Sequence, residues 1–157
     1  MDKGPLRILF VCTGNTCRSP IAEGIMRHLL PEDFRHRFQV SSAGTGAGNG
    51  TPPSELARRA CLIRGIDISR HLSRPIDQQI IRQADIILAM ERRHKELIAE
   101  WGGGGKAFLL TGYPPGLGPG GEIEDPIGRD EEAYGVLYET LEREISRIIL
   151  HLIRNAR

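Results

Sequence analysis

The sequence is poor in cysteine, in aromatic residues and in net charge. Its 157 residues include three cysteines, four phenylalanines, three tyrosines and one tryptophan, and the formal net charge is +1. An odd, sparse cysteine count argues against a secreted disulfide framework and favours a reduced, cytoplasmic location. Near-neutral charge, with no stripe of basic residues interleaved with aromatics, argues against nucleic acid as a partner.

Long apolar runs are also missing. The run over residues 8–12 is shorter than the ~20 residues of a membrane-spanning helix and the ~7–15 of a signal-peptide core, so we expect no membrane span. A chain of this length buries roughly 70% of its unfolded surface without disulfides or a structural metal. No metal site is expected, because no histidine lies at ligand spacing from Cys12 and Cys17, and His28 and His94 are expected to be solvated.

Short apolar segments typical of buried strands alternate with amphipathic segments typical of helices. Strands are predicted over residues 6–11, 38–42, 84–90 and 106–110. Helices are predicted to begin at Pro20, with Ser19 as N-cap, at Pro53, and at Glu91. The second helix is expected to bury Leu56, Ala60, Cys61 and Ile63. The clearest pattern is the apolar stripe of the last helix, formed by Ala133, Val136, Leu137, Leu141, Ile145, Ile148, Ile149, Leu152 and Ile153.

This alternation predicts an α/β fold: a three-layer α/β/α sandwich with a central four-stranded parallel sheet. Parallel sheets bind ligands beyond the carboxyl ends of their strands, so chemistry is expected in the turns after the first and fourth strands. The segment 111–128 is long for a connection in a compact chain, which favours a functional loop.

The turn after the first strand has the composition of a phosphate-binding loop. Residues 12–19 read Cys-Thr-Gly-Asn-Thr-Cys-Arg-Ser and run from a strand into a helix N-terminus, where backbone N–H groups and the helix dipole attract anions. Gly14 and Asn15 tolerate the left-handed backbone that such a loop needs. Arg18 offers a planar fork for two phosphate oxygens. The same environment is expected to lower the pKa of Cys12 to roughly 3.5–7.5 and make it a thiolate nucleophile.

The segment 11–20 resembles the signature of the low-molecular-weight protein phosphatases. Further segments, 41–45, 65–68, 84–90 and 125–126, fall where that family keeps similar sequence, so the resemblance covers nearly the whole chain and implies one phosphatase domain over residues 1–157. It implies Cys12 as nucleophile, Arg18 as phosphate clamp and Asp125 as general acid. It also implies a supporting hydrogen-bond network of Asn15, Ser19, Ser42 and His71.

Two positions bear on the substrate that this resemblance implies. Thr16 resembles the bacterial protein-arginine phosphatases, whereas phosphotyrosine-specific members usually carry isoleucine there. Ile127 follows Asp125-Pro126 in place of the tyrosine typical of tyrosine-specific members, but it also departs from the phenylalanine frequent in arginine-specific ones. No aromatic residue occurs between Phe38 and Trp101 to stack on a phenol ring. The substrate-binding residues are expected to be Thr13, Gly14, Asn15, Thr16, Cys17 and Ile127.

We therefore expect hydrolysis of phosphoarginine in proteins through a phosphocysteine, without a cofactor, opposite a protein arginine kinase that adds the phosphate. Phosphotyrosine is the alternative substrate. An arsenate reductase of similar loop is disfavoured because its relay needs two further cysteines near residues 80–92. The glycines at 102–105 and 116–121 lack the spacing of a nucleotide-binding loop, and a purely phosphate-binding module has no use for Cys12 or Asp125.

The roles of the other two cysteines are less clearly indicated by the sequence. Cys17 either forms a reversible disulfide with Cys12 under oxidation or fills space in the core. Cys61 is expected in the core. Trp101, Tyr113 and Tyr134 are candidates for the rim of the site, and the sequence alone does not place them.

Overall fold

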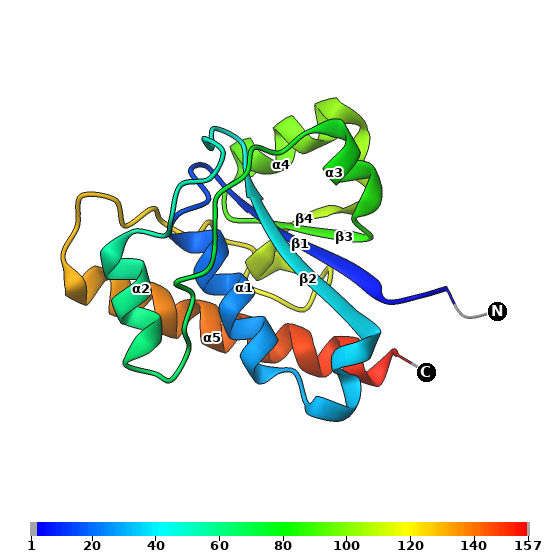
Figure 1. Ribbon diagram of the computed structural model, residues 1–157. Coiled ribbons are helices and arrows are strands. Elements are labelled where there is room, and N and C mark those ends of the chain that lie inside the picture. The colour runs from blue at the N-terminus through cyan, green and yellow to red at the C-terminus, as the bar shows by residue number, and fades with distance from the viewer. Residues whose placement is uncertain (1–2, 157) are drawn as a thin grey trace.

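The computed structural model describes residues 3–156. Its sheet has four parallel strands in the order β2-β1-β3-β4, which confirms the predicted sheet (Figure 1). The strands are β1 (Leu6–Cys12), β2 (Phe38–Gly44), β3 (Ile86–Ala89) and β4 (Ala107–Leu109). Because β1 lies between β2 and β3, the segment that follows Cys12 emerges at the middle of the sheet edge.

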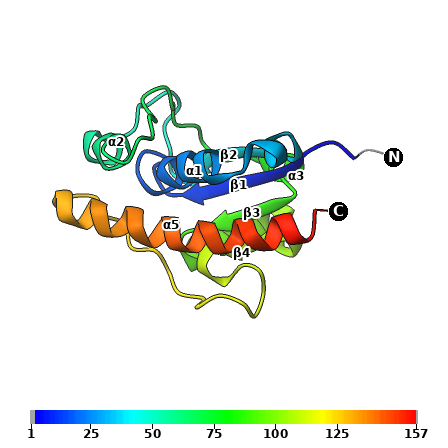
Figure 2. The same ribbon diagram turned by 90° about the horizontal axis from the view of Figure 1, so that it is seen from below.

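Helices cover both faces of the sheet, as the three-layer prediction requires. The helices α1 (Arg18–Leu29), α2 (Glu55–Leu62) and α5 (Glu131–Arg154) lie on one face, and α3 (Gln78–Gln83) and α4 (Arg92–Ile98) lie on the other (Figure 1). Figure 2 shows α5 running the length of the sheet. Along β1, Ile8 and Phe10 enter the α1/α5 core, while Leu9 and Val11 enter the α3/α4 core, the period of two expected of a strand buried on both faces.

Several local predictions were wrong. Helix α1 begins at Arg18, so Ser19 lies inside its first turn and is not the N-cap. Helix α2 begins at Glu55, capped by Ser54, whose side chain accepts a hydrogen bond from the Ala57 backbone N–H. Ile63 and Val136 were expected in the core, but they are 74% and 59% exposed. Helix α3 and a 3-10 turn at Glu32–Arg37 were not predicted, because each is too short to show a periodic pattern.

The 111–128 loop follows a 3-10 turn at Leu110–Gly112 and crosses the carboxyl end of the sheet before α5. One of its anchors is Ile123, a buried residue whose backbone N–H donates to the Met90 carbonyl at 2.9 Å. This contact ties the loop to the end of β3. None of the helices within residues 3–156 has both the length and the apolar character needed to span a membrane.

Candidate active site

The candidate site is built where the carboxyl ends of β1, β2 and β3 meet. The segment after β2 supports the phosphate loop: the backbone N–H groups of Thr45 and Gly46 donate to the carbonyls of Cys12 and Thr13, both at 2.9 Å. Gly44 precedes them, and a Cβ at this position would collide with the Thr13 carbonyl. Glycine is therefore required here by the close approach of two backbones.

Asn15 is the centre of the loop. Its φ is +55°, in the left-handed region that asparagine tolerates, and its side chain is fully buried. Its amide nitrogen donates to the hydroxyls of Ser19 (2.7 Å) and Ser42 (3.0 Å), and its amide oxygen accepts from the Arg74 backbone N–H (3.0 Å). Its carbonyl accepts from Nε2 of His71 at 2.8 Å. The structure thus brings together all four residues expected to form the supporting network.

Cys12 lies at the base of the loop, 2% exposed, with its Sγ 2.9 Å from Ser19 Oγ. Because a thiolate can only accept, the Ser19 hydroxyl donates to the sulfur once Cys12 has lost its proton. This hydrogen bond and the charge of Arg18 lower the pKa of the thiol, but burial outweighs them and raises its pKa above the ordinary value. The predicted lowering was therefore wrong, since the sequence shows the stabilising groups but not the depth of burial.

Arg18 is held almost completely out of solvent, at 1% exposure. Its Nη1 donates to Glu91 Oε2 at 2.8 Å and to the Ile123 carbonyl at 2.7 Å. Both hydrogens of Nη1 are thereby used, which leaves the edge formed by Nε and Nη2 for a ligand. A guanidinium edge of this kind can donate two parallel hydrogen bonds to two phosphate oxygens.

Asp125 lies on the other side of this guanidinium. Its Oδ2 is 3.5 Å from Arg18 Nη2, and its side chain is 31% exposed. Its Oδ1 accepts from the Ile127 backbone N–H at 3.1 Å, which orients the carboxylate at the start of a turn. The Ile127 side chain itself is 62% exposed. Asp125 can thus reach both the loop and solvent.

A second set of charged residues, not predicted from the sequence, surrounds Thr13. His94 is buried, not solvated as expected: its Nδ1 accepts from the Glu91 backbone N–H, so Nε2 carries the proton and donates to Thr13 Oγ1 at 2.8 Å. Burial, followed by the charge of Arg18, lowers the pKa of His94 to about 4 and keeps it neutral. Arg93 donates to Thr13 Oγ1 (2.9 Å) and to Glu91 (3.1 Å).

The sequence does hold a signal for this set. Glu91 lies two residues after the buried end of β3, at an edge where parallel sheets place their ligands. Its carboxylate joins Arg18 to Arg93, and the hydrogen bonds of both guanidinium groups, acting against burial, lower its pKa. The pair Glu91 and Arg18 therefore behaves as a fixed ion pair behind the loop.

Cys17 and Thr16 form the side of the loop that faces α2 and α5. Cys17 Sγ lies 3.3 Å from both Ser54 Oγ and the Tyr134 hydroxyl, and burial raises the pKa of Tyr134 to about 12. The Thr16 carbonyl accepts from the Ser54 backbone N–H at 2.9 Å, and its hydroxyl has only a long, 3.9 Å contact with Cys17 Sγ. The side chain of Thr16 is half-buried, so its hydroxyl remains able to contact a ligand.

The other rim candidates are separated by the structure. Tyr134 lies against the loop, whereas Tyr113 packs on Phe108 and His151. Trp101 is 37% exposed in the irregular turn after α4. Gly14 is half-buried within the loop, and Cys61 lies in the core as expected, with its pKa raised to about 12 by burial.

Comparison with known proteins agrees with this geometry. The family model described as low molecular weight phosphotyrosine protein phosphatase matches residues 7–157. The chain belongs to the low molecular weight phosphatase family. The match spans β1 to the end of α5 and includes every element that contributes to the site. The resemblance seen in the loop sequence is thereby confirmed.

Relatives within the low molecular weight phosphatases carry two kinds of name. The protein-arginine-phosphatase of Bacillus subtilis is 32% identical over 96% of this chain and 99% of its own. The low molecular weight protein-tyrosine-phosphatase PtpB of Staphylococcus aureus is 38% identical over 87% and 91%. A solved structure of the YwlE arginine phosphatase, a cysteine-to-serine mutant with a phosphorylated active-site serine, matches with a TM-score of 0.85 and 32% identity over 94% and 95%.

Proposed function

We propose that this chain is a cysteine-dependent protein phosphatase that hydrolyses phosphoarginine through a phosphocysteine intermediate. The observation that carries the proposal is the placement of Cys12 Sγ, the Ser19 hydroxyl and the Arg18 guanidinium around one loop on a helix N-terminus. We further propose that residues 1–157 act as one catalytic domain in the cytoplasm, on proteins phosphorylated by an arginine kinase.

In the first step, the phosphoryl group lies in the loop. The Nε and Nη2 edge of Arg18 and the backbone N–H groups of residues 13–18 hold its oxygens. Cys12 Sγ attacks phosphorus and the bond from phosphorus to the guanidine nitrogen breaks. Asp125 gives its proton to the departing nitrogen, which would otherwise leave as a strongly basic anion. The supporting observation is that Asp125 lies 3.5 Å from Arg18, on the open side of the loop.

In the second step, water attacks the phosphocysteine. Asp125, now a carboxylate, takes a proton from that water, and the sulfur leaves as a thiolate. The Ser19 hydroxyl donates to the sulfur at 2.9 Å, so it stabilises the anion both as nucleophile and as leaving group. Since burial alone raises the pKa of Cys12, this hydrogen bond and the nearby Arg18 are the means by which the thiolate becomes accessible.

The preference for phosphoarginine rests on the wall of the site. Thr16 presents a hydroxyl with no short contact to Cys17, which suits a flat polar guanidinium better than a phenol ring. The similarity to arginine phosphatases over nearly the whole chain supports the same substrate. The alternative, phosphotyrosine, is favoured by the equally extensive similarity to PtpB and by Tyr134, an aromatic ring beside the loop.

The deciding experiment measures kcat/KM on two peptides of matched sequence, one with phosphoarginine and one with phosphotyrosine. A preference for phosphoarginine of about tenfold or more, worth about 1.4 kcal/mol in transition-state binding, is expected. A Thr16→Ile variant should shift the ratio toward phosphotyrosine, with Thr51→Ile, the same change at an exposed position outside the 12–18 loop, as the control. A preference for phosphotyrosine in the wild type would be compatible with the proposed mechanism but would refute phosphoarginine as the preferred substrate.

A further inference from the structure

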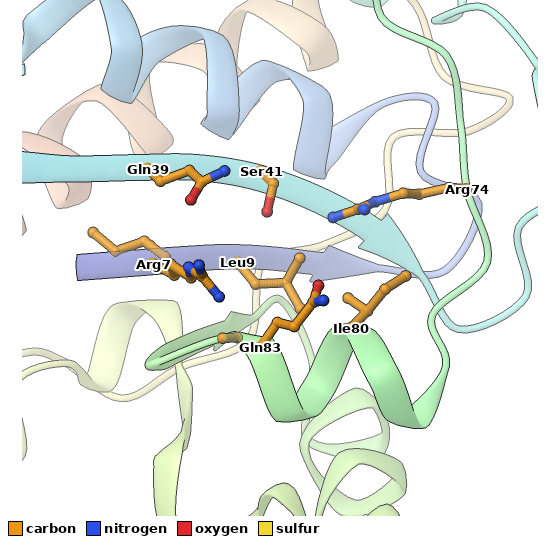
Figure 3. A pocket seen from close by; sticks show the side chains of 9 residues that line it. Arg7, Leu9, Gln39, Ser41, Arg74, Ile80 and Gln83 are labelled. Atoms are coloured by element: carbon orange, nitrogen blue, oxygen red, sulfur yellow. The ribbon is translucent and has the colours of Figure 1, made fainter. Parts of the chain in front are cut away.

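A polar cavity of about 380 Å³ lies on the α3 face of the sheet, on the opposite face from α1 and α5. Figure 3 shows its lining: side chains from β1 and β2 above, Ile80 and Gln83 from α3 below, and Arg74 reaching in from the segment before α3. The residues that give the cavity its chemistry are Arg7, Leu9, Gln39, Ser41, Arg74 and Gln83. None of them is proposed to touch the substrate, and Arg74 alone contacts the supporting network of the phosphate loop, through its backbone N–H and its Nε.

The register of the sheet explains why the cavity exists. Arg7 pairs with Gln39 and Leu9 pairs with Ser41, so these four side chains share the face that buries Val11 and Ala43 further along. Helix α3 has only six residues and covers Leu9, but β2 is the edge strand and the start of its face stays open. On the opposite face of β2, Phe38 and Val40 are buried in the core. The polar residues Gln39 and Ser41 on the cavity face are consistent with a surface that contacts solvent.

The charge of the cavity is of one sign. Its lining supplies two guanidinium groups, two amides and a hydroxyl, and no carboxylate is among the lining residues. Within residues 3–156, no ion pair closer than 4 Å involves Arg7 or Arg74. The Asp85 carboxylate accepts from the backbone N–H of Arg7 at 2.7 Å, and Asp85 is not among the lining residues. Two guanidinium groups that line one cavity, with no carboxylate among the lining residues, form a site that can bind an anion.

We propose that this cavity binds a small organic anion carrying two or more carboxylate or phosphate groups. Arg7 and Arg74 hold the anionic groups, Gln39, Ser41 and Gln83 supply further polar contacts, and Leu9 and Ile80 form the apolar floor. The volume lies within the roughly 300–1,000 Å³ of small-molecule sites. It is too small for a folded partner and suits a metabolite-sized molecule.

Arg74 connects the cavity to the phosphate loop, so an anion bound in the cavity can affect the loop. Its Nε donates to the Ser42 carbonyl at 2.9 Å, and its backbone N–H donates to Asn15 Oδ1 at 3.0 Å. Asn15 in turn holds Ser19, whose hydroxyl lies against Cys12. An anion that draws the Arg74 guanidinium toward Arg7 therefore acts on the residue that positions the nucleophile, and the two sites are linked.

The binding test is an NMR titration of the ¹⁵N-labelled protein with citrate and, separately, with pyrophosphate. Backbone amides of residues 7, 39, 41 and 83 should shift, and those shifts should saturate. Arg7→Gln should weaken this binding about tenfold or more, while Arg82→Gln, which removes an exposed charge from α3 outside the cavity, should change it less than about twofold. Tighter binding of one probe identifies carboxylate or phosphate as the preferred group.

Three outcomes overturn the site: no saturable shift at these amides, equal weakening by both variants, or shifts confined to residues 12–18. None of these depends on turnover, so failure of the site and failure of the proposed reaction are distinguishable.

The linkage has its own measurement. At saturating substrate, citrate or pyrophosphate no longer competes for the phosphate loop. A change in kcat when either anion is added therefore reports binding in the cavity. The change should be lost in Arg7→Gln and kept in Arg82→Gln. An unchanged kcat in the wild type, with binding demonstrated by NMR, would overturn the linkage to Arg74.

Discussion

The two segments that supply the proposed chemistry are held in opposite ways. The phosphate loop is fixed by hydrogen bonds from the segment after β2, from His71 and from Arg74, and Asn15 has no exposed surface. The 111–128 loop is anchored at Ile123 but carries the exposed side chains of Leu117 and Ile127 and three glycines with positive φ. The difference teaches that a nucleophile and its anion site need a rigid frame, whereas a general acid that meets a varied leaving group tolerates a looser one.

Removing the nucleophile should have the largest effect on activity. Cys12→Ser should reduce turnover by ~10⁴-fold or more, because a buried hydroxyl is a far weaker nucleophile and leaving group than a thiolate. Turnover of a phosphoarginine peptide measures this, and an unchanged melting temperature shows that the frame is intact. Cys61→Ser is the matched control. Full activity in Cys12→Ser would refute the proposed mechanism.

Replacing the acid should affect activity alone. Asp125→Asn should lower kcat on phosphoarginine by ~10²–10⁴-fold, since no proton reaches the leaving nitrogen. Because the carboxylate is partly exposed and lies in the looser loop, the free energy of unfolding should stay within about 0.5 kcal/mol of the wild type. The neighbouring Glu124→Gln, which changes an exposed carboxylate, serves as the control. A large loss of stability in Asp125→Asn would show that both loops are equally structural.

Breaking the frame should affect both activity and stability. Asn15→Ala removes four side-chain or conformational supports at once: two donors, one acceptor and tolerance of φ +55°. We expect kcat to fall roughly tenfold and the free energy of unfolding to fall by about 1–3 kcal/mol, from unsatisfied buried partners. Urea denaturation together with steady-state kinetics checks this. If stability stays unchanged while activity falls, the loop is not held as described.

The last prediction concerns pH. Burial lowers the pKa of His94 to about 4, below the value near 6.5 of the unfolded chain, so the unfolded state binds more protons between those limits. The contribution of neutral His94 to the free energy of unfolding is therefore complete above about pH 6.5. It is lost as the pH falls toward 4, by at most about 1.4 kcal/mol per pH unit. His94→Gln should flatten this slope in denaturation measured from pH 7 to 4.5, and the exposed His28→Gln should not.

Features of this protein that depend on neighbouring residues in the chain could be predicted from the sequence. The strands, the layer order and residues 12–19 follow from short periodic runs and one contiguous motif, and the structure confirms the fold. Residues that reach the site from afar are harder to find: Arg74 and His94 acquire their partners only through the register of β2 and β3. The raised pKa of Cys12 was missed for the same reason, because burial is a property of the packed chain. The exposed Val136 shows the reverse error, since an apolar stripe can be wider than the face it buries.

The placement of β1 in the middle of the sheet has a consequence for how the protein comes to be active. The hydrogen bonds that fix the loop join residues 27, 56, 59, 73 and 105 positions apart in the chain. Contacts of such separation form late and slowly, because the loop-closure entropy is lost before they contribute. During synthesis the phosphate loop emerges before Arg74, Glu91 and Ile123, and it lacks its supports until these residues have followed. An immature chain therefore carries a cysteine without catalytic power, and activity appears only with the completed fold.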